Sequence, residues 1–349
     1  MSVSDFAPWQ RRAYQAACAR MDGGGLAHGL LFCGPAHMGK RAVAEALARR
    51  MLCTSRDAHG DACGACRGCE LFAAGTHPDY RFVSFIPNKE GSRLRTELVI
   101  EQIREVSERL TLTPQYGGAQ VVVIDPADAI NHAACNALLK TLEEPQPDRY
   151  LWLVTAHPAR LPATIRSRCQ RLEFPLPPHD EALAWLQRQG HAAKATDEAL
   201  QAARGHPGLA HAWLADGRLA LRREVAGDLS QLATGKAAAV QTAQRWTADG
   251  DADLRLRFAA EIALEQAGLQ QAGLQQAGLQ QAGLQQPAPA QGAGLTDPRR
   301  TRRLAAWFDT ANRTRDLLRT TVRADLAVTE LLLAWRDASV GHGERTGAR

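Results

Sequence analysis

The sequence has no long apolar run. No stretch approaches the roughly 20 consecutive apolar residues that a membrane-spanning helix requires. The first residues, MSVSDFAPWQRRAYQ, also lack the apolar core of a secretory signal. These two absences exclude a membrane-spanning chain and lead us to expect a cytoplasmic protein.

Charge of one sign is not strongly in excess either. The formal net charge is only +5, and basic residues are not gathered with aromatic residues into one stripe. A small nucleic-acid-binding module would show such a stripe, so a zinc-bearing DNA-binding module is the least favoured of three interpretations. With 349 residues, 45% hydrophobic and 23% charged, the chain is long and apolar enough for two or three globular domains.

Cysteines are few but unevenly placed. Of the eight, three are spaced C-x2-C-x2-C at Cys63, Cys66 and Cys69, and Cys53 lies shortly upstream. Zinc prefers four tetrahedral thiolate or imidazole ligands, and this spacing allows neighbouring sulfurs to close on one ion. An iron–sulfur cluster of the ferredoxin type would need a further Cys followed by Pro, which is missing. The spacing predicts structural zinc, with His59 as an alternative to Cys53 as fourth ligand.

A phosphate-binding loop is present in degraded form. Gly34–Arg41 reads GPAHMGKR after a predicted strand and before a predicted helix, so Gly34, Gly39 and Lys40 match the motif. Arg41 replaces the Ser or Thr that would bind Mg²⁺. After the strand Val121–Ile124, Asp125 is kept but Pro126 replaces the glutamate that polarises water in active ATPases. We therefore expect neither ATP binding nor hydrolysis at this loop.

Strand-like and helix-like runs alternate over the first half of the chain, which predicts a parallel sheet with helices on both faces. After the linker Pro175–Pro178 only helical runs follow. We therefore expect an α/β fold followed by an all-α region, divided into domains 1–175, 176–216 and 217–349.

The pentad QAGLQ, repeated four times in Gln266–Gln285, places its leucines around a helix without forming a stripe. We interpret 266–296 as a flexible insertion, with a frayed helical extension as the alternative. The expected helices and strands are Gly29–Cys33, Lys40–Leu52, Tyr80–Ile86, the stripe from Val99 to Leu110, Val121–Ile124, Ala129–Leu142, Tyr150–Thr155, Gln170–Phe174, Ala182–Arg188, Asp197–Ala203, Leu209–Ala215 and Leu326–Trp335.

Four segments together resemble the delta-prime subunits of bacterial DNA polymerase III clamp loaders, an AAA+ family. They are CGACRGC, GTHPDY at 75–80, NALLKTLEEP at 136–145 and TIRSRC at 164–169. The resemblance covers most of 9–174. It implies an AAA+ parallel-sheet domain with an inserted zinc loop (53–69), a small helical lid domain and a C-terminal helical collar.

The resemblance also implies function. Ser167, Arg168 and Cys169 match a motif in which the arginine is a finger offered to a neighbour's ATP. The implied partners are gamma/tau and delta subunits in a hetero-pentameric ring, with the sliding clamp and primed DNA reached through the complex. The chain would then be a rigid member of a DNA-directed DNA polymerase (nucleotidyltransferase) holoenzyme with no ATPase activity of its own. The alternative is an active gamma/tau-type ATPase, which Lys40 favours and which Arg41 and Pro126 oppose.

Overall fold

The chain folds into two compact units, Met1–Ala212 and Trp213–Arg349. The computed structural model describes residues 3–88, 91, 94–116, 118–268, 298–318, 320 and 322–339. Most of the predicted insertion 266–296 lies outside these residues. Among the helices that are described, none is long and apolar enough to span a membrane.

A five-stranded, wholly parallel sheet organises the first unit, with strand order β2-β3-β4-β1-β5. The three central strands are almost fully buried and rich in Val, Leu and aromatic residues, as expected for strands covered on both faces. The strands are β1 Gly29–Cys33, β2 Tyr80–Val83, β3 Gln120–Ile124, β4 Arg149–Thr155 and β5 Gln170–Glu173.

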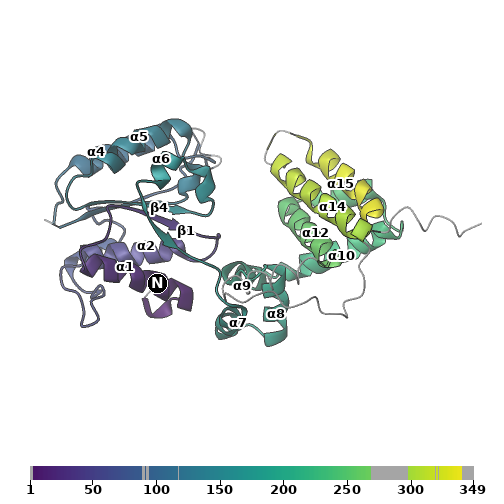
Figure 1. The fold of residues 1–349 in the computed structure, drawn as a ribbon, viewed down its shortest axis with the longest axis horizontal. Helices are drawn as coiled ribbons and strands as arrows, with labels where there is room; N and C mark the ends of the chain where they lie inside the picture. Colours follow the sequence, from purple (N-terminus) through teal and green to yellow (C-terminus); the bar gives the residue numbers. More distant parts are fainter. Residues whose placement is uncertain are drawn as a thin grey trace, which may run out of the picture. The chain divides into compact units, whose positions relative to one another are not determined.

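Helices cover both faces of this sheet (Figure 1). Successive strand residues point to opposite faces, so Val121 and Val123 pack with α1 and α2, whereas Val122 and Ile124 pack with α4 and α5. Two apolar cores result, one on each side of the sheet. The helices around the sheet are α1 Pro8–Asp22, α2 Lys40–Leu52, α3 Arg67–Ala73, α4 Ile100–Thr111, α5 His132–Glu143 and α6 Ala163–Arg166.

The α/β prediction is confirmed, and most element bounds agree to within a few residues. One helix begins later than predicted: α5 starts at His132 rather than Ala129, because the Asn131 side chain accepts the Ala134 N–H at 3.0 Å and caps the helix there. Strand β2 ends at Val83, three residues before the predicted end. Three short helices follow the sheet: α7 His179–Arg188 and α8 Ala193–Ala202 in the first unit, and α9 Pro207–Ala215, which contains the boundary between the two units.

The second unit is all-helical where it is described, as predicted. Trp307 and Trp335 pack edge-to-face with ring centroids 4.7 Å apart. Each indole N–H donates to a backbone carbonyl on another helix, of Leu331 and Leu229 respectively. These bonds satisfy buried donors while fixing the helix positions. The helices are α10 Leu219–Ala233, α11 Ala239–Thr247, α12 Ala252–Gln266, α14 Pro298–Leu317 and α15 Ala324–Ser339.

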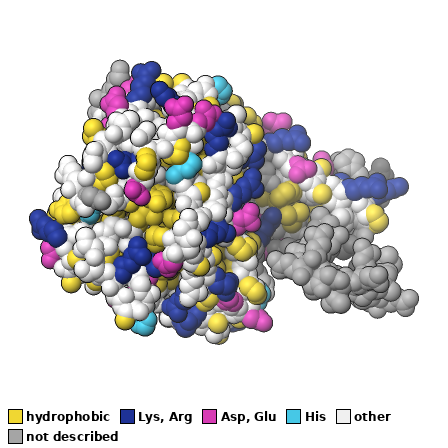
Figure 2. Space-filling model, turned by 60° about the vertical axis from the view of Figure 1, so that its left-hand side comes forward, with side chains coloured by type: hydrophobic (Ala, Val, Ile, Leu, Met, Phe, Trp, Pro, Cys, Tyr) yellow, Lys and Arg dark blue, Asp and Glu magenta, His cyan; other side chains and the backbone are white. Residues whose placement is uncertain are grey.

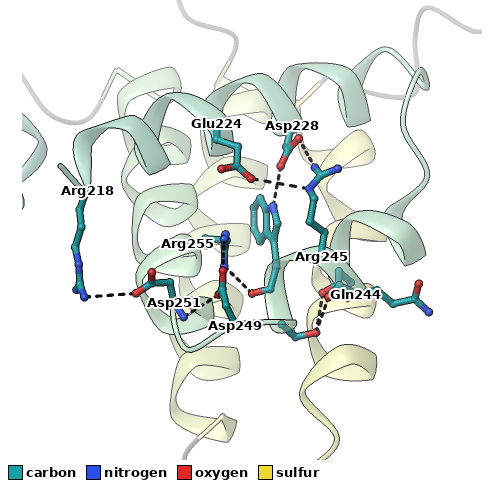
Figure 3. A network of polar contacts seen from close by, with 11 residues as sticks. Arg218, Glu224, Asp228, Gln244, Arg245, Asp249, Asp251 and Arg255 are labelled. Atoms are coloured by element: carbon teal, nitrogen blue, oxygen red, sulfur yellow. Dashed lines mark hydrogen bonds and ion pairs between the residues drawn. The ribbon is translucent and has the colours of Figure 1, made fainter. Parts of the chain in front are cut away.

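A polar network joins α10, α11 and the start of α12 (Figure 3). Asp228 is 8% exposed and accepts hydrogen bonds from the Trp246 indole, at 2.8 Å, and from Arg245. Arg255, 6% exposed, donates to the Trp246 carbonyl and to both oxygens of Asp249. The network therefore brackets the fully buried Trp246 from both sides.

We expect Asp228→Ala to destabilise the second unit. The change leaves the buried Trp246 N–H without an acceptor, which costs about 1–3 kcal/mol. Asp216→Ala is the matched control, because Asp216 is exposed and its contact with Arg218 is 3.8 Å long, and such surface changes stay within about 0.5 kcal/mol. Denaturant unfolding followed by tryptophan fluorescence measures both, and equal stability of the two variants would contradict the role given to Asp228.

Candidate functional site

The four clustered cysteines come together in space. Cys53 follows α2, Cys63 lies in the connecting loop, and Cys66 and Cys69 are at the start of α3. All four sulfurs lie within 4.8 Å of one another. Cys53 Sγ is 3.6 Å from Cys63 Sγ and 3.8 Å from Cys66 Sγ. The predicted grouping is therefore present, and the cluster could bind a metal ion.

These distances suit one tetrahedral ion. With Zn–S bonds of about 2.3 Å, the edge of a tetrahedron of sulfurs is about 3.8 Å. His59 is exposed and does not belong to the group; its backbone N–H is bound to the Asp57 side chain instead. Of the two fourth ligands considered, the geometry thus brings Cys53 to the site.

Backbone amides face the sulfurs in a repeating way. The N–H of Cys63 donates to Cys53 Sγ, that of Cys66 to Cys63 Sγ, and that of Cys69 to Cys66 Sγ, at 3.3–3.5 Å. Burial opposes ionisation of Cys66, but hydrogen bonds from Thr54 and the Cys69 amide outweigh it and lower its pKa to about 5. Burial, with the neighbouring sulfurs, raises the pKa of Cys69 to about 12. Sulfurs this close hinder each other's ionisation unless a cation is shared between them.

The phosphate-loop residues are positioned as predicted between β1 and α2, but Lys40 turns back on its own loop. Lys40 is 6% exposed, and its ammonium donates to the carbonyls of Gly34 and Pro35. Burial lowers the pKa of Lys40 to about 8, against the opposing charges of Asp125 and Asp128.

Two other segments close over the phosphate loop. The Gln10 side chain of α1 donates to the Gly39 carbonyl, and a Cβ on Gly39 would lie 1.6 Å from its amide nitrogen. On another side, a Cβ on Gly208 of α9 would lie 1.8 Å from the His37 carbonyl. Gly39 also has a φ of 75°, a left-handed conformation that favours glycine. The loop is thus packed directly against α1 and α9.

The Mg²⁺ side of the loop is occupied by cations. Arg41 donates to Glu45 at 2.7 Å, and its guanidinium lies 3.8 Å from the Phe82 ring centroid. Burial raises the pKa of Asp125, against the charges of Arg41 and Lys40. A divalent ion at Asp125 would therefore have to compete with two side-chain cations, and no hydroxyl is available at position 41 to bind it.

The second acidic residue of this segment has a different role. Asp128 accepts the Thr155 hydroxyl at 2.7 Å and the Ala156 N–H at 3.2 Å. Thr155 stands at the end of β4. Asp128 and Thr155 therefore form a fixed structural pair beneath the phosphate loop.

Arg168 lies near the amino-terminal ends of the strands, whereas the phosphate loop follows the carboxyl-terminal end of β1. It comes two residues before Gln170, which pairs with Leu30 near the start of β1, whereas the loop follows the end of β1. At about 3.3 Å per residue, the six residues from Arg168 to Phe174, which is level with Gly34, span roughly 15–20 Å. Arg168 therefore lies far from the phosphate loop of its own chain.

Local contacts order the Arg168 side chain. It forms an ion pair with Glu143 at 2.7 Å and donates to the Thr164 carbonyl at 2.9 Å, yet remains 36% exposed. The two neighbouring residues of the motif, Ser167 and Cys169, differ from each other in exposure. Ser167 is exposed and donates to Thr164, whereas Cys169 is 7% exposed and belongs to the core between sheet and helices.

Sequence reasoning missed the residues that surround these motifs. Gln10 and Glu143 were not singled out, although Pro8 and Gln10 form the start signal of a helix and Glu143 lies within NALLKTLEEP. On the face drawn in Figure 2, the Lys and Arg side chains of the described residues are interspersed with Asp and Glu.

Comparison with known proteins adds to this geometry. A family model described as DNA polymerase III, delta subunit, matches residues 9–178. The DNA polymerase III subunit delta' of Pseudomonas aeruginosa is 38% identical over 246 residues, covering 70% of this chain and 72% of that protein. The subunit delta' of Escherichia coli K12 is 40% identical over 204 residues, covering 58% and 59% respectively. The DNA polymerase III subunit tau of Bacillus subtilis is 30% identical over 149 residues, covering 43% of this chain and 25% of that protein.

Proposed function

The chain belongs to the family of DNA polymerase III delta' subunits, components of the clamp loader, and we propose that it acts in a clamp-loader ring without hydrolysing ATP itself. Its proposed partners are gamma/tau and delta subunits in a hetero-pentamer. The ring would open the sliding clamp and place it on primed DNA. A role in bacterial replication also fits the cytoplasmic location expected from the sequence.

The placement of Arg168 carries this proposal. An arginine whose backbone is roughly 15–20 Å from its own phosphate loop, at the opposite ends of the strands, serves no nucleotide in its own chain. Exposed there, it can be offered to an ATP held by a neighbour, where it would neutralise the charge that develops on the transferred phosphoryl group.

The rest of the motif is proposed to hold this arginine in place. Cys169 is buried in the core, and a burial-raised pKa of about 11 keeps its thiol neutral, so packing is its role. Gly29 lets β1 approach closely: a Cβ there would lie 3.2 Å from the Arg168 carbonyl. Ser167 and Thr164 at the end of α6 fix the turn before Arg168.

For the cysteine cluster we propose one structural zinc bound by Cys53, Cys63, Cys66 and Cys69. The sulfur spacing matches a tetrahedral thiolate site, and sulfur ligands favour zinc over harder divalent ions. Four protein ligands leave no open position for a reacting water, so the ion would stabilise the loop 53–69 rather than catalyse.

We further propose the three-part organisation 1–175, 176–216 and 217–349, with the last part as the collar that holds the ring together. The lid helices would be tied to the first part by the bidentate pair of Arg12 and Glu181, at 2.7 and 2.8 Å.

The purified chain is expected to show no ATPase activity above background. Arg41 removes the hydroxyl for Mg²⁺ and Pro126 removes the glutamate that polarises water, so neither half of the reaction is supported. Steady-state phosphate release, measured for wild type and Lys40→Ala, tests this. Turnover that survives repurification and disappears in Lys40→Ala would instead establish a gamma/tau-type ATPase.

A further inference from the structure

His77, in the segment GTHPDY, is a buried polar residue that none of the roles above explains. Its side chain is 4% exposed, and its Nε2 atom has no hydrogen-bond partner in the protein. Buried donors and acceptors in native proteins are almost always paired, and an orphan often marks a place where an ion or its ligands complete the pairing.

The tautomer of His77 follows from its other nitrogen. Nδ1 accepts the backbone N–H of Asp79 at 3.0 Å. A neutral imidazole has one donor and one acceptor, so Nε2 must carry the hydrogen. The unpartnered atom is therefore an N–H donor with a fixed direction.

That donor lies beside the cysteine cluster. A Cβ on Gly68, between Cys66 and Cys69, would be 3.6 Å from His77 Nε2 and 2.7 Å from the Leu52 carbonyl. Gly68 thus allows the turn that carries two of the sulfurs to approach both α2 and the imidazole.

On its far side the same segment is anchored to the core. Asp79, 2% exposed, accepts the N–H groups of Gln115 and Tyr116 at 2.8 and 3.1 Å, and its carbonyl accepts the Val121 N–H of β3. Because His77 is bonded to Asp79, the imidazole is held against the sheet from behind. It cannot turn away from the cluster without breaking these bonds.

We propose that His77 is a positioning residue of the metal site, its Nε2–H donating to a thiolate of the turn that carries Cys66 and Cys69 once the metal is bound. The inference rests on the metal site proposed above. Such donors outside the ligand shell orient the ligands and spread their negative charge, and their loss typically lowers metal affinity about 10- to 100-fold.

The test uses two substitutions that separate the two nitrogens. His77→Asn retains an acceptor near the Nδ1 position for Asp79 but removes the donor, whereas His77→Gln can place an amide N–H near the Nε2 position. Zinc affinity of the full chain is measured by chelator competition. The thiolate-to-metal charge-transfer band is measured with Co²⁺ in place of zinc.

We expect His77→Asn to bind zinc about 10- to 100-fold more weakly and to shift the Co²⁺ band to longer wavelength, because an unbonded thiolate gives up electron density more easily. His77→Gln should stay near wild type. His28→Asn is the control, since His28 is partly buried and bonded to the Leu142 carbonyl outside the cluster.

Wild-type affinity and spectrum in His77→Asn would overturn the proposal. So would equal losses in His77→Asn and His77→Gln, because the donor would not be what matters. If His77→Asn does not fold, the Gln variant decides: wild-type affinity and band position support the donor role, and a loss refutes it. A wild-type chain that takes up no metal would refute the metal site itself, a result distinct from a loss confined to the variants.

Discussion

Arg168→Ala in a reconstituted clamp loader is expected to leave the ring assembled, to reduce DNA-stimulated ATP hydrolysis partly, and to reduce clamp loading more strongly. Arginine fingers contribute roughly 10³–10⁵-fold to hydrolysis at the site they serve. Only the site next to this chain would lose its finger, so the other sites continue to turn over. Loading requires the sites to act together, so it should suffer more than total hydrolysis. Both rates are measured on complexes of matched assembly with gamma/tau and delta subunits, clamp and primed DNA.

Two further substitutions sharpen this test. Arg168→Lys should rescue loading poorly, because a single ammonium lacks the planar fork that grips phosphate oxygens. Arg171→Ala, an exposed arginine three residues further along on β5, should load like wild type. Equal loading by wild type and Arg168→Ala would mean that Arg168 is an ordinary surface arginine.

Cys66→Ser and Cys69→Ser are each expected to remove the metal and to destabilise the first unit. Serine keeps the size of the side chain but is a poor zinc ligand, and structural zinc contributes about 10–16 kcal/mol to the folding of small zinc domains. Here the loop is attached to two apolar cores, so we expect the unit to fold but to melt earlier, by about 2–4 °C for each kcal/mol lost. Elemental analysis and thermal unfolding give the two readouts.

The controls for this prediction come from the same domain. Cys135→Ser changes a buried cysteine outside the cluster, and His59→Ala changes the alternative ligand. Both proteins should keep about one zinc per chain and no iron, as in the wild type. Full zinc occupancy in Cys66→Ser and Cys69→Ser, or its loss in His59→Ala, would contradict the proposed ligand set.

The elements that the sequence predicted best are those with a local signal at each end. Helix α2 has the predicted bounds because the preceding loop ends at Gly39, which has a left-handed conformation, and helix-forming residues follow it without a break. Strand β3 was equally clear, since an uninterrupted β-branched run of this length suits a strand buried on both faces. Spacing alone also brought three of the cysteines together, because turns of two residues leave little freedom.

The interactions that depend on distant residues could not be predicted. Gln10 reaches Gly39 across 29 positions of the sequence, and Arg168 meets Glu143 because the end of α5 lies beside α6. His77 likewise depends on how α3 returns to α2 at Gly68. Local patterns identify such residue types as polar, but tertiary packing decides which of them meet.

The most direct test of the central claim compares Lys40→Ala with Arg168→Ala in the reconstituted loader. Lys40 belongs to the chain's own phosphate loop, and Arg168 is proposed to serve a neighbour's. If the chain acts in trans without using ATP itself, complexes with Lys40→Ala should load clamps at the wild-type rate and complexes with Arg168→Ala should not. Loss of loading with Lys40→Ala, and wild-type loading with Arg168→Ala, would contradict the account.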